Sequence, residues 1–142
     1  MVVLDTNVVS ELMKAQPWPA VKTWLAAQPR PTVFISAITE AELRLGVALL
    51  PDGRRCGALA ADMEALIVED FAERVLPFDS LAAKAFATIV ADRRRSGRPI
   101  AIPDAQIAAV ARSRRASVAT RNVGDFEGCG VDVVNPWSGV KA

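Results

Sequence analysis

The stretch Val2-Val-Leu-Asp-Thr-Asn7 begins with three apolar residues and ends with three polar ones. We read residues 2–4 as a short strand and residues 6–14 as the helix that follows it. Asp5 then stands at the carboxyl end of the strand, which is where open α/β sheets place their ligand sites. Asp is also a favoured cap for the first turn of a helix, so the pattern alone leaves both roles open.

The same alternation of short β-branched runs with longer helical stretches continues along the chain. It predicts an α/β domain with a mostly parallel sheet. Further strands are expected at residues 33–35, 75–78, 118–120 and 131–134, and further helices at residues 19–27, 37–50, 54–69, 80–95 and 103–115. Since no linker or repeat divides these elements, we expect a single domain over residues 1–142.

The clearest helical pattern lies at residues 80–95. Its apolar stripe predicts packing on the sheet, and consists of Leu81, Ala82, Ala85, Phe86, Ile89 and Val90. Ser80 is placed to cap the start of this helix, and Gly97 follows its end.

Composition excludes several classes of chemistry. The chain has 142 residues, 51% of them apolar, a formal net charge of +1 and no His. One domain of this size can bury a core without a disulfide or a metal. The lack of His excludes His-based acid/base catalysis, Ser-His-Asp and Cys-His nucleophiles, and zinc sites that use imidazole.

Cys56 and Cys129 are the two cysteines, and they do not form a CxxC motif. One pair cannot make a disulfide framework, which favours a reducing, cytoplasmic compartment. We expect neither a signal peptide nor a membrane span, because the chain starts directly with patterned sequence and has no long uninterrupted apolar segment.

Charge is distributed unevenly along the chain. Between residues 93 and 122 eight Arg face one acid, Asp104, whereas residues 62–79 carry six acids and one Arg. The basic stretch can form a rim that binds phosphates. Several of these Arg also fall near expected helix ends, where cations stabilise the helix dipole, so the structural role stays open.

With no His and no Gly-rich phosphate loop, hydrolytic chemistry has to come from carboxylates. Glu42 falls on an expected apolar stripe with Ile38, Leu45 and Leu49, where an unpaired carboxylate is costly. The alternative is a capping box in which Glu42 folds back on Thr39. The box needs the helix to begin at Thr39, whereas the apolar residues suggest an earlier start near Ser36, which can itself cap.

Two further acids also allow both an ordinary structural explanation and a role at a site. Asp104 comes after Pro103 at an expected helix start, and Asp125 lies in an expected turn beside Gly124. Each has an ordinary explanation, in the helix dipole and in turn chemistry respectively. Together with Asp5, however, they lie at the carboxyl ends of predicted strands or at the helix starts that follow them. We expect these ends to share one edge of a parallel sheet, where a divalent cation would relieve the mutual repulsion of the acids.

Four segments in this order resemble the PIN-domain ribonucleases, specifically the VapC toxins of toxin–antitoxin pairs and their FitB-like branch. They are Val2 to Asn7, Ser36 to Gly46, Asp104 to Ala109 and Thr120 to Phe126, and the resemblance runs to about Trp137. It implies a three-layer α/β/α sandwich on a mostly parallel sheet of about five strands, the PIN-like fold.

The resemblance also implies site residues. Asp5, Glu42 and Asp104 match the family's metal-binding acids, and Asp125 matches another commonly acidic position, whereas Asn122 stands where the family often has an acid. Thr6, Asn7, Thr120 and Asn122 match supporting polar positions. The implied activity is hydrolysis of RNA phosphodiester bonds with Mg²⁺ or Mn²⁺, and Arg93, Arg98 and Arg121 are expected to bind RNA phosphates.

The implied partners are RNA, a cognate VapB-like antitoxin that inhibits the enzyme, operator DNA bound through that antitoxin, and a second copy in a homodimer. Two rival hypotheses remain. One is a catalytically silent PIN-like module that binds proteins. The other is a phosphatase or phospho-receiver with Asp5 as nucleophile, which the presence of Asn7 in place of a second Asp disfavours.

Overall fold

The computed structural model describes residues 1–138, so the last four residues of the expected domain lie outside the described range. The strands are β1 (Val2–Leu4), β2 (Val33–Ser36), β3 (Val75–Leu76), β4 (Ser117–Ala119) and β5 (Val133–Val134). The helices are α1 (Thr6–Leu12), α2 (Pro19–Ala26), α3 (Ala37–Ala48), α4 (Arg54–Ala65), α5 (Ser80–Arg95), α6 (Ile102–Ser113) and α7 (Val123–Phe126). A 3₁₀ turn, η1 (Arg30–Thr32), precedes β2, and a π-helical turn, η2 (Leu66–Asp70), extends α4.

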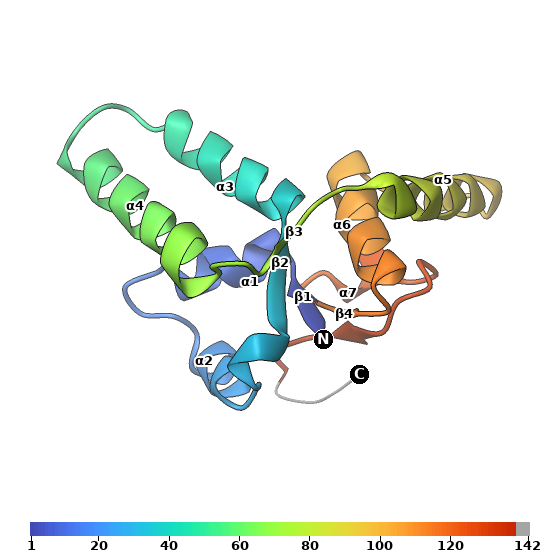
Figure 1. The fold of residues 1–142 in the computed structure, drawn as a ribbon, viewed down its shortest axis with the longest axis horizontal. Helices are drawn as coiled ribbons and strands as arrows, with labels where there is room; N and C mark the ends of the chain where they lie inside the picture. The colour runs from blue at the N-terminus through green and yellow to red at the C-terminus, as the bar shows by residue number, and fades with distance from the viewer. Residues whose placement is uncertain (139–142) are drawn as a thin grey trace.

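The five strands form one parallel sheet in the order β3-β2-β1-β4-β5, with β1 at its centre (Figure 1). Val2 is in register with Val33 of β2 and with Ser117 of β4. Because all strands run the same way, their carboxyl ends share one edge. Asp5, directly after β1, therefore stands at the middle of that edge.

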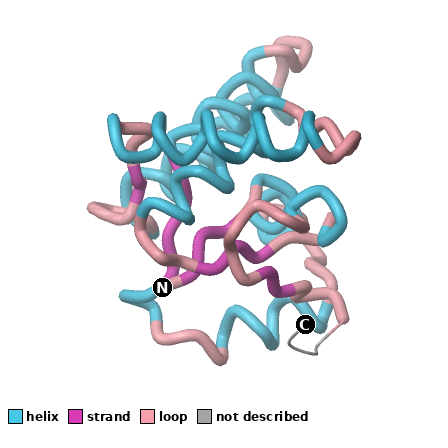
Figure 2. Tube along the Cα trace, turned by 90° about the vertical axis from the view of Figure 1, so that its right-hand side faces the viewer, coloured by secondary structure: helices cyan, strands magenta, loops and turns pink. Residues whose placement is uncertain are grey.

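Helices cover both faces of the sheet, as expected of a three-layer α/β/α sandwich (Figure 2). Val3 of β1 faces the core formed with α5, α6 and α7, whereas Val2 and Leu4 face the core formed with α1 to α4. This alternation follows from the two-residue period of a strand. The expectation for residues 80–95 needs a correction, since α5 packs mainly on α6 and Leu81 is 61% exposed.

Several element ends differ from the sequence-based expectation for local reasons. The strand β3 ends before Pro77, which has no backbone N–H for the ladder. Gly130 adopts a left-handed φ of 75°, and β5 begins only after this bend. Asp79, rather than Ser80, caps α5, because its Oδ1 accepts a hydrogen bond from the Ala82 amide at 3.0 Å.

The expected buried face of α3 and the capping box at Thr39 are both wrong, whereas the expected start of the helix near Ser36 is confirmed. Leu45 and Leu49 are 58% and 75% exposed, and Glu42 is exposed with them. The buried residues of α3 are instead Thr39 and Leu43. Each of them follows by one position a residue of the expected stripe, Ile38 or Glu42. Ser36 caps α3 by accepting a hydrogen bond from the Thr39 amide at 3.2 Å, so no capping box begins at Thr39.

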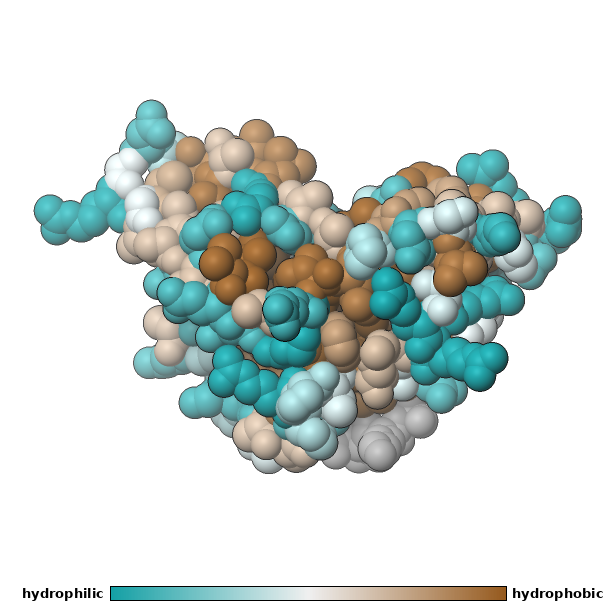
Figure 3. Space-filling view, in the orientation of Figure 1, coloured by the Kyte–Doolittle hydropathy of each residue, from teal (hydrophilic) through white to brown (hydrophobic). Residues whose placement is uncertain are grey.

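The surface is hollowed between two raised parts of the molecule, one over α3 and α4 and the other over α5 and α6 (Figure 3). Within residues 1–138 no helix is both long and apolar enough to cross a membrane.

Candidate active site

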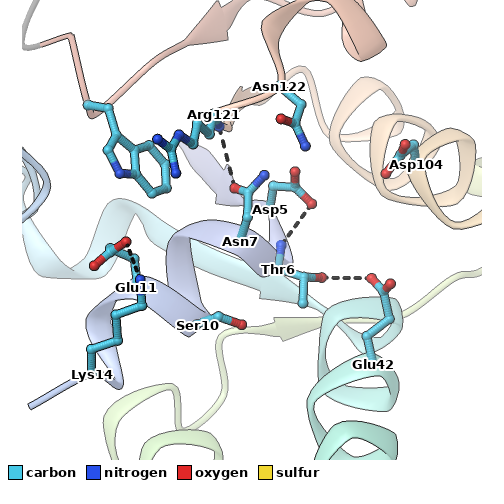
Figure 4. Close-up of a pocket in the computed structure, with 11 residues that line it drawn as sticks. Asp5, Thr6, Asn7, Ser10, Glu11, Lys14, Glu42, Asp104, Arg121 and Asn122 are labelled. Atoms are coloured by element: carbon cyan, nitrogen blue, oxygen red, sulfur yellow. Dashed lines mark hydrogen bonds and ion pairs between the residues drawn. The ribbon is translucent and has the colours of Figure 1, made fainter. Parts of the chain in front are cut away.

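An open pocket of about 440 Å³ lies at the carboxyl end of β1 (Figure 4). Its wall is built from α1, the middle of α3, the first turn of α6 and the segments after β4 and β5. The lining residues are Asp5, Thr6, Asn7, Ser10, Glu11, Lys14, Glu42, Asp104, Arg121, Asn122 and Trp137. Three of the four acids predicted for the site, Asp5, Glu42 and Asp104, thus share one cavity.

Asp5 has both of the roles that its sequence position left open. It caps α1, because Oδ1 accepts a hydrogen bond from the Thr6 amide at 2.7 Å, and it lines the pocket. The Thr120 hydroxyl donates to Oδ2 at 2.7 Å, so both carboxylate oxygens are held. Burial raises the pKa of Asp5, the charges of Glu42 and Asp125 add to this rise, and the two hydrogen bonds oppose it.

Glu42 reaches the pocket from the exposed face of α3. The Thr6 hydroxyl donates to its Oε1 at 2.7 Å and lies 3.1 Å from the Thr39 hydroxyl. This chain of hydroxyls links α1 to α3 across the pocket floor. Thr6 therefore supports an acid, as predicted, although the acid it bonds through its side chain is Glu42.

Asp104 lies in the first turn of α6, facing the pocket from the side opposite α1 (Figure 4). Burial, followed by the negative charges of Asp5, Asp125 and Glu42, raises its pKa to about 6. Removal of the carboxylate from water is the larger cause of this rise, and repulsion by the neighbouring carboxylates adds to it. Titratable groups perturbed in this way are concentrated at functional sites.

Thr120 organises the other side of the pocket. Besides bonding Asp5, its hydroxyl accepts hydrogen bonds from the Asn122 amide at 3.0 Å and from Nδ2 of Asn7 at 3.4 Å. Asn122 lines the pocket, whereas Asp125 is exposed on α7 and does not. Asp125 acts on the site through its charge, since it raises the pKa of Asp5 and Asp104.

Arg93 does not have the place that we expected for a phosphate-binding residue. It is 7% exposed, and its guanidinium donates to the carbonyls of Arg98, Asp125 and Glu127 at 2.6, 3.0 and 2.8 Å. The side chain also lies 3.7 Å from the sulfur of Cys129. These contacts tie α5 to the segment around α7, so Arg93 is a structural residue rather than an RNA contact.

The other two predicted arginines are exposed. Arg98 pairs with Glu127 at 3.3 Å, outside the pocket. Arg121 lines the pocket, where its backbone amide donates to Oδ1 of Asn7 at 3.4 Å.

Sequence reasoning missed Ser10, Glu11, Lys14 and Trp137 as pocket residues. The first three follow Asn7 at intervals of three, four and seven residues, which is the spacing of one helix face. That spacing could have found them once Asn7 was assigned to the site. Trp137 carries no comparable signal, because only the fold brings it beside residues more than a hundred positions earlier.

The donor set suits a hard divalent cation. Mg²⁺ and Mn²⁺ prefer carboxylate and other oxygen ligands, and the repulsion among Asp5, Glu42 and Asp104 is the kind that a cation relieves. The acids are not gathered into a closed cage: within residues 1–138 no three acidic or cysteine side chains form a ready metal-binding group, and Glu42 is bonded to Thr6 instead. The pocket therefore offers the oxygen ligands that such a metal prefers, although its acids in the described chain are not arranged as a closed ligand set.

Comparison with known proteins identifies the family. A PIN domain is recognised over residues 2–127. The chain is 45% identical to the VapC ribonuclease Y4jK of Sinorhizobium fredii, over 96% of this chain and 98% of that protein. It is 44% identical to the toxin FitB of Neisseria gonorrhoeae, over 96% and 99% of the two chains.

Among solved structures, FitAB bound to an IR36 DNA fragment matches with a TM-score of 0.90 and 44% identity, over 96% of both chains. The strand order and the layers described above are thus those of a known fold. From the match over most of its length and the identity to these relatives, the chain belongs to the PIN-domain family, in the group that contains the VapC and FitB toxins.

Proposed function

We propose that this protein is a metal-dependent endoribonuclease, the toxin of a type II toxin–antitoxin pair. The observation that carries the proposal is the set of three carboxylates, Asp5, Glu42 and Asp104, in one open pocket at the carboxyl edge of the sheet. Their like charges perturb one another, and the chain has no His for another route of hydrolysis. The similarity to a VapC ribonuclease supports the same reaction.

Asp5, Glu42 and Asp104 would hold Mg²⁺ or Mn²⁺. When bound, such an ion lowers the pKa of a water and stabilises charge on a phosphate oxygen. Thr120 and the Thr6 amide keep the Asp5 carboxylate oriented, and the Thr6 hydroxyl keeps Glu42 at the pocket. These residues preorganise the acidic groups, so less free energy is needed to arrange them during the reaction.

The remaining polar residues would position RNA. Asn122 and Asn7 line the pocket and are joined through Thr120, whereas Asp125 would act from outside through its charge. Arg121 in the pocket and Arg98 on the surface would bind backbone phosphates. The products would carry 5′-phosphate and 3′-hydroxyl ends.

The proposal includes the regulation that is typical of a toxin. A cognate VapB-like antitoxin would inhibit the enzyme in the cytoplasm, operator DNA would bind through that antitoxin, and the toxin would form a homodimer. The similarity to the FitAB complex bound to DNA supports the antitoxin and the DNA. We also propose that the whole chain forms one domain, to which the described residues belong.

The test is cleavage of a mixed cellular RNA pool by the purified chain freed of any partner. The reactions contain EDTA, Mg²⁺ or Mn²⁺, and compare the wild type with Asp5→Asn and with Asp62→Asn, which removes an exposed acid outside the pocket. We expect cleavage that needs a divalent ion, disappears in Asp5→Asn and persists in Asp62→Asn. Asp5→Asn should stay folded, since it removes one of several like charges from the site.

Cleavage by Asp5→Asn at the wild-type rate would refute the site. A folded, partner-free protein that cuts no RNA with either metal would instead favour the catalytically silent protein-binding module. Addition of the cognate antitoxin should stop any cleavage that is observed.

A further inference from the structure

The pocket has two chemically different sides. Asp104 and Glu42 lie on one side of the pocket, and Asp5 lies near its middle (Figure 4). The opposite wall carries Arg121 and Lys14. If the reacting phosphate of a nucleic-acid strand lies at the carboxylates, the adjacent phosphates of that strand lie along the wall that carries Arg121 and Lys14. The two cations on this wall are not equivalent, because their charges are balanced differently.

Lys14 is already neutralised. Its ammonium donates to Oε1 of Glu11 at 3.0 Å, and Oε2 of Glu11 accepts from the Trp18 amide at 3.2 Å. The hydrogen bond from Lys14 lowers the pKa of Glu11, so this carboxylate stays charged. Lys14 and Glu11 thus form a pair of zero net charge at the pocket wall.

Arg121 has no such partner. Within residues 1–138 no carboxylate is close enough to form an ion pair with its guanidinium. The backbone of Arg121 is anchored by the bond from its amide to Asn7, and the residue itself is exposed. It therefore presents a positive charge without an ion-pair partner inside the same pocket as the acids, and this charge also helps to lower the pKa of Glu11.

The indole of Trp137 holds this charge in place. The guanidinium carbon lies 5.3 Å from the ring centroid, within the range of a cation–π interaction. No hydrogen bond within residues 1–138 uses the guanidinium N–H groups of Arg121, so they are able to donate to an anion. The stack also covers one face of Trp137, so that face cannot stack on a base.

We propose that Arg121, positioned by Trp137, is the binding subsite for the RNA phosphate next to the scissile one. The inference rests on the proposed function for the identity of the strand. Arg121 contacts the phosphate directly, with the planar donor geometry that suits phosphate oxygens. Trp137 is a positioning residue, which acts only through the guanidinium.

The test is binding of a single-stranded RNA oligonucleotide in EDTA, measured by fluorescence anisotropy at several salt concentrations. We expect Arg121→Gln to lower affinity about tenfold, because one charge-assisted hydrogen-bonding group is lost. The slope of the logarithm of affinity against the logarithm of salt concentration should fall by about 0.7. Arg121→Lys should keep the slope, and Arg54→Gln, an exposed cation outside the pocket, should match the wild type.

Trp137 is tested by rescue. Trp137→Phe keeps an aromatic face for the guanidinium and should bind RNA nearly as the wild type does, whereas Trp137→Leu should weaken binding in the direction of Arg121→Gln. A general loss of packing would affect both Trp137 variants, and circular dichroism would reveal it.

The outcomes separate this subsite from the nuclease activity. Loss of binding in Arg121→Gln supports the subsite even if the wild type cuts no RNA, since the measurement is made without metal. Wild-type binding by Arg121→Gln overturns the subsite even if the nuclease is confirmed. The proposal is also overturned if Arg121→Gln weakens binding of a purified antitoxin alone and leaves RNA binding unchanged, which would assign Arg121 to a protein carboxylate.

Discussion

Two polar clusters of this protein contrast in how their charges are balanced. At the pocket, Asp5, Glu42 and Asp104 face one another, and burial together with the neighbouring negative charges raises the pKa of Asp5 and of Asp104. Around Arg93, one buried guanidinium faces carbonyl oxygens of Arg98 and of the segment near α7. Both clusters join parts of the chain that are distant in sequence, but only the second is electrostatically satisfied.

The contrast separates a functional cluster from a structural one. Buried polar groups that find complementary partners stabilise the fold, whereas groups that repel one another reduce stability and persist where a ligand compensates for them. Of the acidic cluster and the Arg93 cluster, the acidic one alone surrounds an open cavity. Changes in the two clusters should therefore alter the free energy of unfolding in opposite directions.

The largest effect on stability is expected at Arg93. Arg93→Gln should lower the free energy of unfolding by about 3 kcal/mol, because the buried charged donor that joins α5 to the carbonyls near α7 is lost. Urea unfolding at pH 7 measures the change, and Arg94→Gln, on the exposed face of the same helix, is the control. Equal stabilities for the two variants would mean that Arg93 contributes no more than a surface residue.

Thr120 supports the acids and should have the next largest effect. Thr120→Val removes the donor to Asp5 and the acceptor for the Asn122 amide, at a cost of about 2 kcal/mol. The pKa of Asp5 should rise further, since that hydrogen bond favours its charged form. Carboxyl titration by NMR measures the pKa and thermal unfolding the stability, with Thr88→Val at an exposed helical site as the control. An unchanged pKa of Asp5 would contradict this role.

Stability should depend on pH through Asp104. Its pKa in the folded protein is about 6, above the ordinary value of 3.8, so between these values the folded state holds a proton that the unfolded chain has released. The contribution of Asp104 to stability is therefore lost as pH rises through this window and is constant above it. After allowance for solvent screening, the loss is on the order of 1 kcal/mol.

Asp104→Asn isolates this contribution. In EDTA the variant should be more stable than the wild type at pH 8 by on the order of 1 kcal/mol, and the difference should vanish near pH 4. Acids far from the pocket titrate alike in both proteins and cancel, whereas the loss of repulsion between Asp104 and its neighbours is part of the difference measured. A difference in unfolding midpoint that is the same at every pH would show that Asp104 does not repel its neighbours.

Sequence patterns predicted the strands and the shared edge well, since the strands are short β-branched runs and parallel strands end together. That logic places Asp5 at the shared edge from the sequence alone, whereas Asp104 follows α5 rather than a strand and depended on the family resemblance. The supporting hydrogen bonds of Thr6 and Thr120 depend on side-chain orientations, and the family resemblance named the residues without predicting those partners.

The face of α3 and the role of Arg93 could not be predicted in this way. Leu45 and Leu49 complete an apolar stripe that the fold leaves exposed, and exposed Leu is common on protein surfaces. Arg93 is balanced by backbone carbonyls, which every residue has, so its burial leaves no pattern in side-chain identities. In the sequence it looks the same as the exposed Arg94 and Arg95 beside it.

Glu42 is expected to have the smallest effect on stability, and its replacement should separate a loss of activity from a loss of stability most clearly. It belongs to the acidic cluster but is exposed, so water screens its charge more than that of Asp5. Glu42→Gln should change the free energy of unfolding by less than about 0.5 kcal/mol, because the amide oxygen can still accept from the Thr6 hydroxyl. Cleavage with Mg²⁺ should nevertheless fall by about 10²-fold or more, since a neutral amide is a poor ligand for a hard cation. Urea unfolding and initial cleavage rates measure the two effects on the same preparation.

Wild-type cleavage with unchanged stability would remove Glu42 from the site and leave it as a rim residue bonded to Thr6. If the free energy of unfolding and the cleavage rate of Glu42→Gln both fell, the exposure of Glu42 would not explain its contribution to stability. The distinction between repelling and satisfied polar clusters would then fail at the residue where it is easiest to test.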